Sequence, residues 1–421
     1  MAIDFAAVDR AFPRYTEFSP EVPVWCLTPE STGYIHRFFD TSPTSPSGRY
    51  VGLTRLPTED EVPPPGTAAE VVLIDLLTGT RRVVAETAGW ESQLGAGVQW
   101  GATDRELLFN TVDPETWELG CVILDPTDGT SRTLPGSVYM AAPSRRKIVS
   151  ASLDRTARAQ GGYGVLLPEE RMPAHSGAPG DDGVWVTDMD SGSRTLVASI
   201  ADLVSSLLTE EHELRLGPGG YYGFHTKWNH DETRIMFVLR FIPDPVAASS
   251  NARPVLFLIA MDADGGGAKL LLPPFFWADR GGHHPNWMPD GVNALMNLRD
   301  ENGTMRFVEI DGRGLGTVTP LSTTIVGGGH PSVDPLRRRL VTDAYLYEAV
   351  AYGDGTTPIR LVYLETETER RIIRIRTEPK INGERNILRV DPHPAWDREF
   401  DGIVFNGCPT GRRQVFLADL R

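Results

Sequence analysis

Four of the nine histidines in this 421-residue chain share one sequence context. Each stands just before a short strand-like segment, and the four are His225, His284, His330 and His393. Imidazole is a common metal ligand and also a base that titrates near neutral pH. Asp391 stands two residues before His393, and in extended chain the two side chains point to one side, which adds an oxygen ligand.

A single His-Pro-x-Trp sequence would be explained well enough as a packing device whose imidazole caps a turn. Four histidines at equivalent places are harder to explain in that way. If the repeats that follow them close into a ring, the residues before each first strand converge on one mouth of the central channel. The pattern therefore predicts a metal or acid–base site gathered from distant parts of the chain.

The segments after these histidines have the pattern of antiparallel β-hairpins. Residues 294–299 and 305–311 are strand-like and flank a turn at Asn302-Gly303. A second signature, an apolar strand that ends in Asp before a small-residue turn, recurs along the chain, for example at Ile74-Asp75 and Met261-Asp262. Seven such units predict a β-propeller.

We therefore expect an all-β chain, with residues 1–421 forming a single seven-bladed β-propeller domain. The predicted blades begin near residues 45, 98, 138, 225, 284, 330 and 393. The last unit is one strand short, and residues 22–28 can complete it, which removes an exposed sheet edge. Only residues 199–213 show convincing helical spacing of apolar side chains.

Composition narrows the functional classes. A net charge of −15 without a basic stripe argues against nucleic-acid binding, and no apolar run is long enough to span a membrane. The amino terminus lacks the basic and apolar regions of a signal peptide. The three cysteines form no CxxC pair, so we expect buried free thiols in a cytoplasmic protein. Either a monomer or a homodimer is compatible with the sequence.

The chain resembles the oligogalacturonate lyases over most of its length. His284-Pro-Asn-Trp-Met-Pro-Asp-Gly291 is similar to the family's His-Glu-Phe-Trp-x-Pro-Asp-Gly, and Asp391-Pro-His-Pro-Ala-Trp396 is similar to its His-Pro-His-Pro-Ser-Phe. Members of the family are seven-bladed propellers that cleave digalacturonate, a product of pectin degradation, by β-elimination. The resemblance implies a lyase that acts on an acidic, uronate-containing oligosaccharide.

The resemblance also implies roles for individual residues. In the family, three histidines and a glutamine hold manganese. This chain has Asp391 in place of one histidine and Leu388-Arg389-Val390 where the glutamine is expected. The implied ligands of a divalent metal, manganese or else calcium or another ion, are His330 and His393, with Asp391 in the place of the third histidine. The alignment of the four histidines makes His284 a further candidate ligand. The implied catalytic groups are His284 as the base and Arg253, and the leaving oxygen is protonated or stabilised by Arg253, by Tyr163 or by water.

Other side chains are candidates for binding the substrate. Arg155 and Arg158, in the insertion at residues 154–182 that also carries Tyr163, fit a clamp for an anionic sugar, but a solvated surface loop is an equally good interpretation. His225 and His36 fit the lining of the channel mouth, and a structural role suits His36 as well.

Two further functional classes compete with the lyase. A non-catalytic propeller similar to TolB would bind a protein or a sugar, and it would have no reason to align four histidines. A propeller hydrolase would use paired carboxylates, and none stand at equivalent blade starts.

Overall fold

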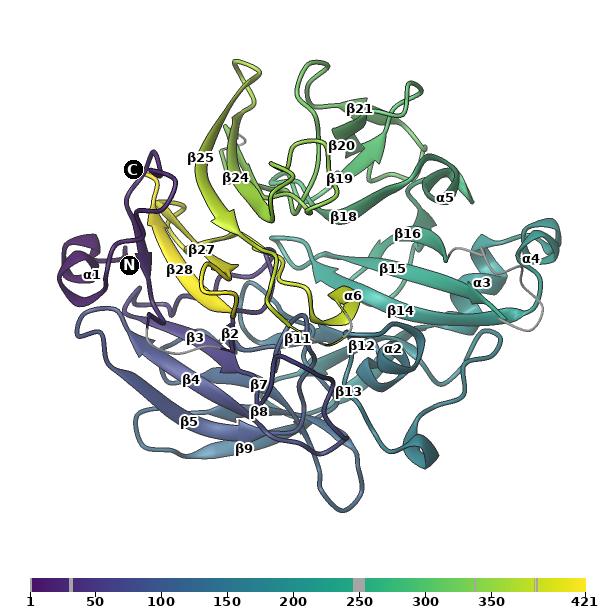
Figure 1. The fold of residues 1–421 in the computed structure, drawn as a ribbon. Helices are drawn as coiled ribbons and strands as arrows, with labels where there is room; N and C mark the ends of the chain where they lie inside the picture. Colours follow the sequence, from purple (N-terminus) through teal and green to yellow (C-terminus); the bar gives the residue numbers. More distant parts are fainter. Residues whose placement is uncertain (1, 30–32, 245–253, 337, 382, 384) are drawn as a thin grey trace. The chain divides into compact units, whose positions relative to one another are not determined.

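The computed structural model describes residues 2–29, 33–244, 254–336, 338–381, 383 and 385–421. Within these residues the strands form seven four-stranded antiparallel sheets (Figure 1). In six of them the four strands are consecutive in the chain, and the seventh combines strands from its two ends. The all-β fold class and the seven blades are thus confirmed.

The first three blades end before residue 200. The first contains β2 (Tyr34–Ile35), β3 (Tyr50–Arg55), β4 (Ala69–Asp75) and β5 (Arg81–Thr87). The second contains β6 (Gln99–Trp100), β7 (Leu107–Val112), β8 (Leu119–Leu124) and β9 (Ser131–Pro135). The third contains β10 (Met140–Ala141), β11 (Lys147–Ser150), β12 (Gly183–Asp188) and β13 (Arg194–Ser199).

The remaining blades carry the four aligned histidines. The fourth contains β14 (Gly219–Trp228), β15 (Arg234–Pro243), β16 (Val255–Asp262) and β17 (Lys269–Leu270). The fifth contains β18 (Gly282–Trp287), β19 (Ala294–Arg299), β20 (Met305–Ile310) and β21 (Val318–Pro320). The sixth contains β22 (Ser332–Val333), β23 (Arg339–Thr342), β24 (Thr356–Tyr363) and β25 (Thr368–Arg376). The seventh contains β26 (Ala395–Trp396), β27 (Gly402–Gly407), β28 (Gln414–Asp419) and β1 (Val24–Cys26).

The pairing of β1 with β28 joins the two ends of the chain in one blade. Val24 lies opposite Ala418 and Cys26 lies opposite Phe416. The prediction that residues 22–28 supply the missing strand is therefore confirmed. Beside this blade, α1 (Phe5–Ala11) begins at Asp4, whose carboxylate accepts a hydrogen bond from Ala7 N at 3.0 Å and so caps the helix.

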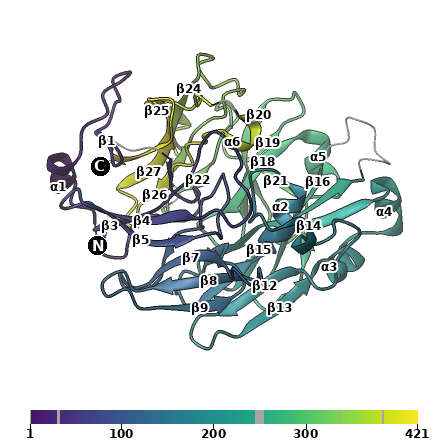
Figure 2. The same cartoon turned by 60° about the horizontal axis from the view of Figure 1, so that its bottom comes forward.

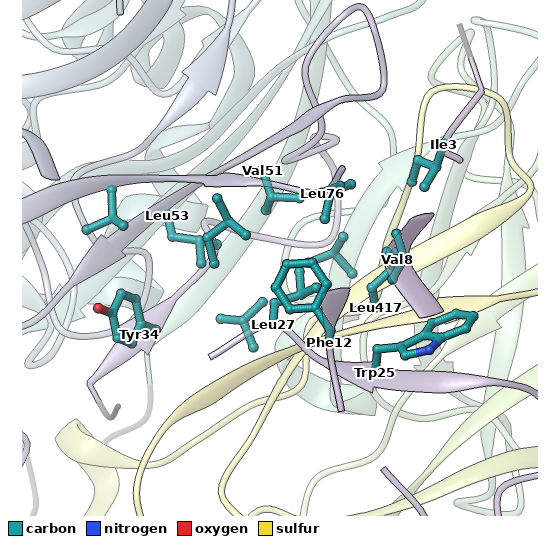
Figure 3. Close-up of a cluster of buried hydrophobic side chains, with 14 of the residues drawn as sticks. Ile3, Val8, Phe12, Trp25, Leu27, Tyr34, Val51, Leu53, Leu76 and Leu417 are labelled. Carbon is teal, nitrogen blue, oxygen red and sulfur yellow. The ribbon is translucent and has the colours of Figure 1, made fainter. Parts of the chain in front are cut away.

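The side chains of these terminal segments share one apolar core with the first blade (Figure 3). Val8 and Trp25 are almost fully buried, and they belong to the same cluster as Leu417, Val51 and Leu53. Fully burying an aliphatic or aromatic side chain of this size contributes roughly 1.5–3 kcal/mol, so the cluster holds the terminal strand in place.

The chain divides into two compact units. One comprises Met1–Thr133 and Gly328–Arg421, and the other comprises Leu134–Gly327. The blade starts differ from the predicted positions at two places. The first blade begins at β2, rather than near residue 45, because this two-residue strand is too short to show any alternation. The fourth begins at Gly219, and His225 lies inside the ten-residue strand β14.

The helical segment predicted at residues 199–213 is two helices. The first, α3 (Ile200–Leu207), directly follows β13 in the chain, and both are labelled in Figure 2. The second, α4 (Glu210–Leu216), begins at Thr209, whose hydroxyl accepts from His212 N while His212 Nδ1 accepts from Thr209 N. This capping box starts a new helix and breaks the apolar spacing on which the prediction of a single helix rested.

The insertion at residues 154–182 contains α2 (Leu153–Ala159) and the short 3-10 helix η1 (Glu169–Arg171). The structure also describes α5 (Phe276–Arg280) and α6 (Arg385–Leu388). Among the described residues, none of the helices has the length and apolar character needed to span a bilayer. Cys26, Cys121 and Cys408 are buried free thiols, as predicted.

Candidate metal centre

His330, Asp391 and His393 come together in the unit that contains the chain ends. One potential ligand atom from each lies within 4.8 Å of the others, and all three residues are buried. The two imidazole rings are perpendicular, with centroids 4.2 Å apart. His330 precedes β22 and His393 precedes β26, so the first strands of two successive blades position them.

A network of backbone hydrogen bonds fixes the segment Asp391–His393. Asn406, in the second strand of the same blade, donates from its side chain to Asp391 O at 3.2 Å and from its backbone to Pro392 O at 2.8 Å. His393 has a φ of 48°, in the left-handed region that non-glycine residues seldom adopt. Such strain is maintained only where the surroundings fix the backbone, as they do here.

Asp343, just after β23, supports both histidines. Its fully buried carboxylate accepts hydrogen bonds from His330 N at 2.7 Å and from His393 N at 3.0 Å, and it lies 2.8 Å from His330 Nδ1. Burial by itself raises the pKa of this carboxyl, but the nearby His330 and these hydrogen bonds outweigh it and lower the pKa below its usual value. The group is therefore a carboxylate that orients His330 through Nδ1 and leaves Nε2 as its ligand atom.

The burial, hydrogen bonding and protonation of His393 suit a metal ligand. Neither of its ring nitrogens, both buried, has a hydrogen-bond partner among the described residues. Burial and the neighbouring His330 lower the pKa of His393 well below its ordinary value, so the ring is neutral at physiological pH. A neutral buried imidazole without a hydrogen bond costs free energy, and a bound cation would satisfy it.

The donor set narrows the identity of the ion. Two imidazole nitrogens and one carboxylate oxygen suit manganese, iron or zinc better than calcium, which prefers oxygen ligands throughout. Three protein ligands also leave coordination positions that a substrate oxygen can occupy. His330, Asp391 and His393 are thus suited to hold a divalent metal ion.

Two arginines make the surroundings of Asp391 cationic. Arg389 Nε donates to Asp391 Oδ2 at 2.8 Å. Arg413 is buried, and its guanidinium donates to backbone oxygens of Ser92, Leu388 and Arg389. Burial lowers the pKa of Arg413. Both arginines line a small, partly open depression together with Asp391, His393 and Gln93.

His36, predicted to bind substrate, is fully buried beside this group. Its Nε2 lies 3.3 Å from Pro392 O, and its ring centroid is 6.4 Å from that of His393. Burial lowers the pKa of His36 to about 4, so it too is neutral. In this structure His36 supports the segment that carries two of the potential ligands.

His225 and His284 lie in the other unit, where they occupy equivalent irregularities of neighbouring blades. The pairing of β14 shifts register between Gly223 and Thr226, and that of β18 shifts between His283 and Asn286. His225 Nδ1 is hydrogen-bonded to the Tyr139 hydroxyl, and His284 Nδ1 lies 2.9 Å from His283 Nδ1. His284 has a φ of 57°, so it shares the left-handed backbone of His393.

The insertion that was predicted to clamp a sugar has structural contacts of its own. Arg155 Nε donates to the buried Asp182 at 2.9 Å, and Arg158 forms a more exposed ion pair with Glu169. Tyr163 is buried, with its ring edge-on to Phe224 at 4.9 Å. Arg253 lies outside the described residues. The substrate and catalytic roles of these residues, and metal binding by His284, remain predictions.

Asp343 and Arg413 were not predicted from the sequence, although strand register provides a signal for Asp343. Ser332 pairs with Val341 and Val333 pairs with Leu340, so the same register sets Asp343 opposite His330. The register of β26 with β27 likewise sets Asn406 opposite His393. In both blades a polar residue therefore lies opposite the histidine that precedes the first strand. Asp343 lies just after the second strand of its blade, and Asn406 lies within the second strand of its own. Arg413 has no comparable signal in the sequence.

Known structures resemble this chain over nearly its whole length. An oligogalacturonate lyase in complex with manganese matches 97% of this chain and 96% of its own, with a TM-score of 0.63 and 15% identity. The oligogalacturonate lyase of Vibrio parahaemolyticus gives the same coverage, with a TM-score of 0.64 and 13% identity. The likeness is one of fold.

Other comparisons add little to this likeness. TolB from Acinetobacter baumannii matches with a TM-score of only 0.40, which is too low to support an argument about function. No protein-family model matches the chain, and no curated protein matches it in sequence. The resemblance to oligogalacturonate lyases seen in the sequence is therefore matched by a shared seven-bladed fold.

Proposed function

We propose that this protein is a metal-dependent lyase that cleaves a uronate-containing oligosaccharide by β-elimination. The observation that carries the proposal is the group formed by His330, Asp391 and His393, with His393 buried, neutral and without a hydrogen bond. The fold shared with a manganese-bound oligogalacturonate lyase supports the same activity class and favours manganese as the ion.

The reaction requires a more acidic C5 proton, a base and stabilisation of the leaving oxygen at C4. A divalent ion at this site, when bound, draws charge from the uronate carboxylate and so acidifies the C5 proton. Arg389 places a further cation beside the ligand Asp391, which favours an anionic substrate despite the net charge of −15.

The remaining roles follow the resemblance. His284 takes the C5 proton as the general base. Arg253 stabilises the departing oxygen, and Tyr163 is the alternative proton donor. Cytoplasmic location and a monomeric or homodimeric state complete the proposal. A non-catalytic TolB-like propeller is the competing function, and it gives no reason for a buried imidazole to lack a hydrogen bond next to a second imidazole and a carboxylate.

The test is the ultraviolet absorbance of a 4,5-unsaturated uronate product. Purified protein is incubated with a panel of oligogalacturonates and other oligouronides, with manganese and with chelator. We expect product only with manganese, and none from His393→Asn. Asparagine is the better replacement because it tolerates the left-handed backbone at this position.

His230→Asn is a matched control, because His230 is an exposed histidine in the other unit. It should be as active as the unmodified protein. A protein that binds oligouronides but forms no product under any metal condition would replace the lyase by a binding function.

A further inference from the structure

Two stacked tyrosines lead from the candidate metal centre to solvent. Tyr345 and Tyr347, in the loop after β23, have nearly parallel rings with an interplanar angle of 11° and centroids 5.1 Å apart. Tyr347 is 79% exposed, more than any other large apolar or aromatic side chain that the structure describes. Isolated apolar side chains on a surface need no explanation, but this ring is the outer end of a continuous series.

The inner end of the series is the metal centre itself. The Tyr345 ring lies 5.4 Å from the ring of His330, which in turn lies 4.2 Å from that of His393. Phe38 and Phe39 contact the same histidines, at 4.7 Å from His393 and 5.3 Å from His330. One aromatic wall therefore runs from the potential ligands to the exposed face of Tyr347.

A carboxylate fixes the position of the tyrosine loop. Glu348 Oε2 accepts hydrogen bonds from Tyr345 N at 2.9 Å and from Gly329 N at 3.0 Å, and Gly329 directly precedes His330. A Cβ on Gly328 would stand 2.8 Å from the same oxygen, so glycine is needed for this approach. The loop and the ligand-bearing segment are thus held as one unit, and the tyrosines are preorganised relative to His330.

The wall has a cation along its inner part. The guanidinium carbon of Arg389 lies 6.0 Å from the Tyr345 ring centroid, while its Nε donates to Asp391. A guanidinium next to an aromatic face suits a ligand with an apolar surface and a carboxylate, because the ring takes the first and the cation takes the second.

We propose that Tyr347, stacked on Tyr345, forms a subsite for a second sugar ring of an acidic oligosaccharide, next to the ring bound at the metal centre. The C–H groups on one face of a pyranose pack against the exposed tyrosine face, and its hydroxyls stay in water. Arg389 faces the carboxylate of the uronate between the platform and the metal. The inference rests on the proposed function for the class of substrate.

The experiment is a calorimetric titration of the full-length protein with trigalacturonate and with galacturonate. Chelator is present throughout, so that no turnover consumes the ligand. We expect Tyr347→Ala to weaken trigalacturonate binding by about three- to tenfold, the size of one aromatic stacking contact. Galacturonate binding, and manganese affinity in a separate titration without chelator, should not change.

Tyr347→Phe keeps the ring and should bind as the unmodified protein does. Leu214→Ala removes a similarly exposed side chain, 76% accessible, from the other unit and should have no effect. Equal trigalacturonate affinities for Tyr347→Ala and the unmodified protein would overturn the subsite.

The two proposals fail in different ways. Trigalacturonate binding that depends on Tyr347, in a protein that forms no unsaturated product with manganese, would support the subsite and refute the lyase. Product formation with an unchanged KM for the trimer in Tyr347→Ala would support the lyase and refute the subsite.

Discussion

Replacing Asp343 by asparagine should weaken metal binding while leaving the fold intact. The carboxylate accepts hydrogen bonds from the backbone nitrogens of His330 and His393 and contacts His330 Nδ1, at distances from 2.7 to 3.0 Å. Asparagine has the same shape, but one oxygen becomes an NH₂ group that faces an N–H donor. His330 then loses the carboxylate that fixes its tautomer and orientation.

The expected size follows from these contacts. Loss of a partner that orients a ligand typically costs 10- to 100-fold in metal affinity, which is about 1.4–2.8 kcal/mol of binding free energy. Losing one hydrogen bond to a charged acceptor lowers the free energy of unfolding by about 1.5–3 kcal/mol. A domain of ordinary stability, roughly 5–15 kcal/mol, tolerates that loss, so the variant should remain folded.

The assay is a manganese titration of metal-free protein by calorimetry, with thermal unfolding measured on the same samples. Asp334→Asn is the matched control, since Asp334 is a buried carboxylate in the same blade that pairs with Arg339 at 3.0 Å. It should lose comparable stability and bind manganese normally. Equal manganese affinities for Asp343→Asn and Asp334→Asn would refute the supporting role of Asp343.

Three further outcomes test other parts of the structure. His393→Asn should abolish manganese binding at little cost in thermal stability, because its imidazole has no hydrogen bond to lose; a large drop in melting temperature would contradict this. His284→Asn should eliminate lyase turnover, because it removes the proposed general base, and product absorbance measures the loss; an active variant would contradict this. Arg155→Gln should lower the free energy of unfolding at pH 8 by about 3–5 kcal/mol, since it leaves the buried Asp182 charge unpaired.

The loss of stability in Arg155→Gln should be larger at high pH than at low pH. Burial raises the pKa of Asp182 from 3.8 to about 6 in the folded protein, so ionising it costs stability as the pH rises from about 4 to 6. Below that range Asp182 is protonated and does not need Arg155. The deficit of Arg155→Gln in urea unfolding should therefore shrink at pH 4, and adding Asp182→Asn should restore stability at pH 8.

The repeat pattern predicted the fold because each blade has its own recognisable sequence pattern. Alternating strands and Asp-containing turns recur often enough that errors in one blade do not affect the next. The short strand Tyr34–Ile35 escaped notice, since two residues show no periodicity. The helix expected at residues 199–213 was divided by a local capping interaction at Thr209, which competes with hydrophobic spacing.

The site was predictable only in part. The position before a first strand identified His330 and His393, and the Asp-x-His spacing identified Asp391. The role of Asp343 depends on strand register, which a sequence pattern sets only approximately. Arg413 stands just before β28, next to another arginine, and backbone oxygens hold its guanidinium. Because backbone acceptors leave no pattern in the sequence, nothing distinguished Arg413 beforehand.

The pairing of Val24 with Ala418 has a consequence for how the protein is made. β1 has no partner strand until β28 has been synthesised, almost 400 residues later, so this sheet forms late relative to the six sheets built from consecutive strands. Asp391 and His393 lie just before β26, the first strand of the same sheet along the chain after His330. The candidate metal centre is therefore expected to be complete only after β28 has paired with β1.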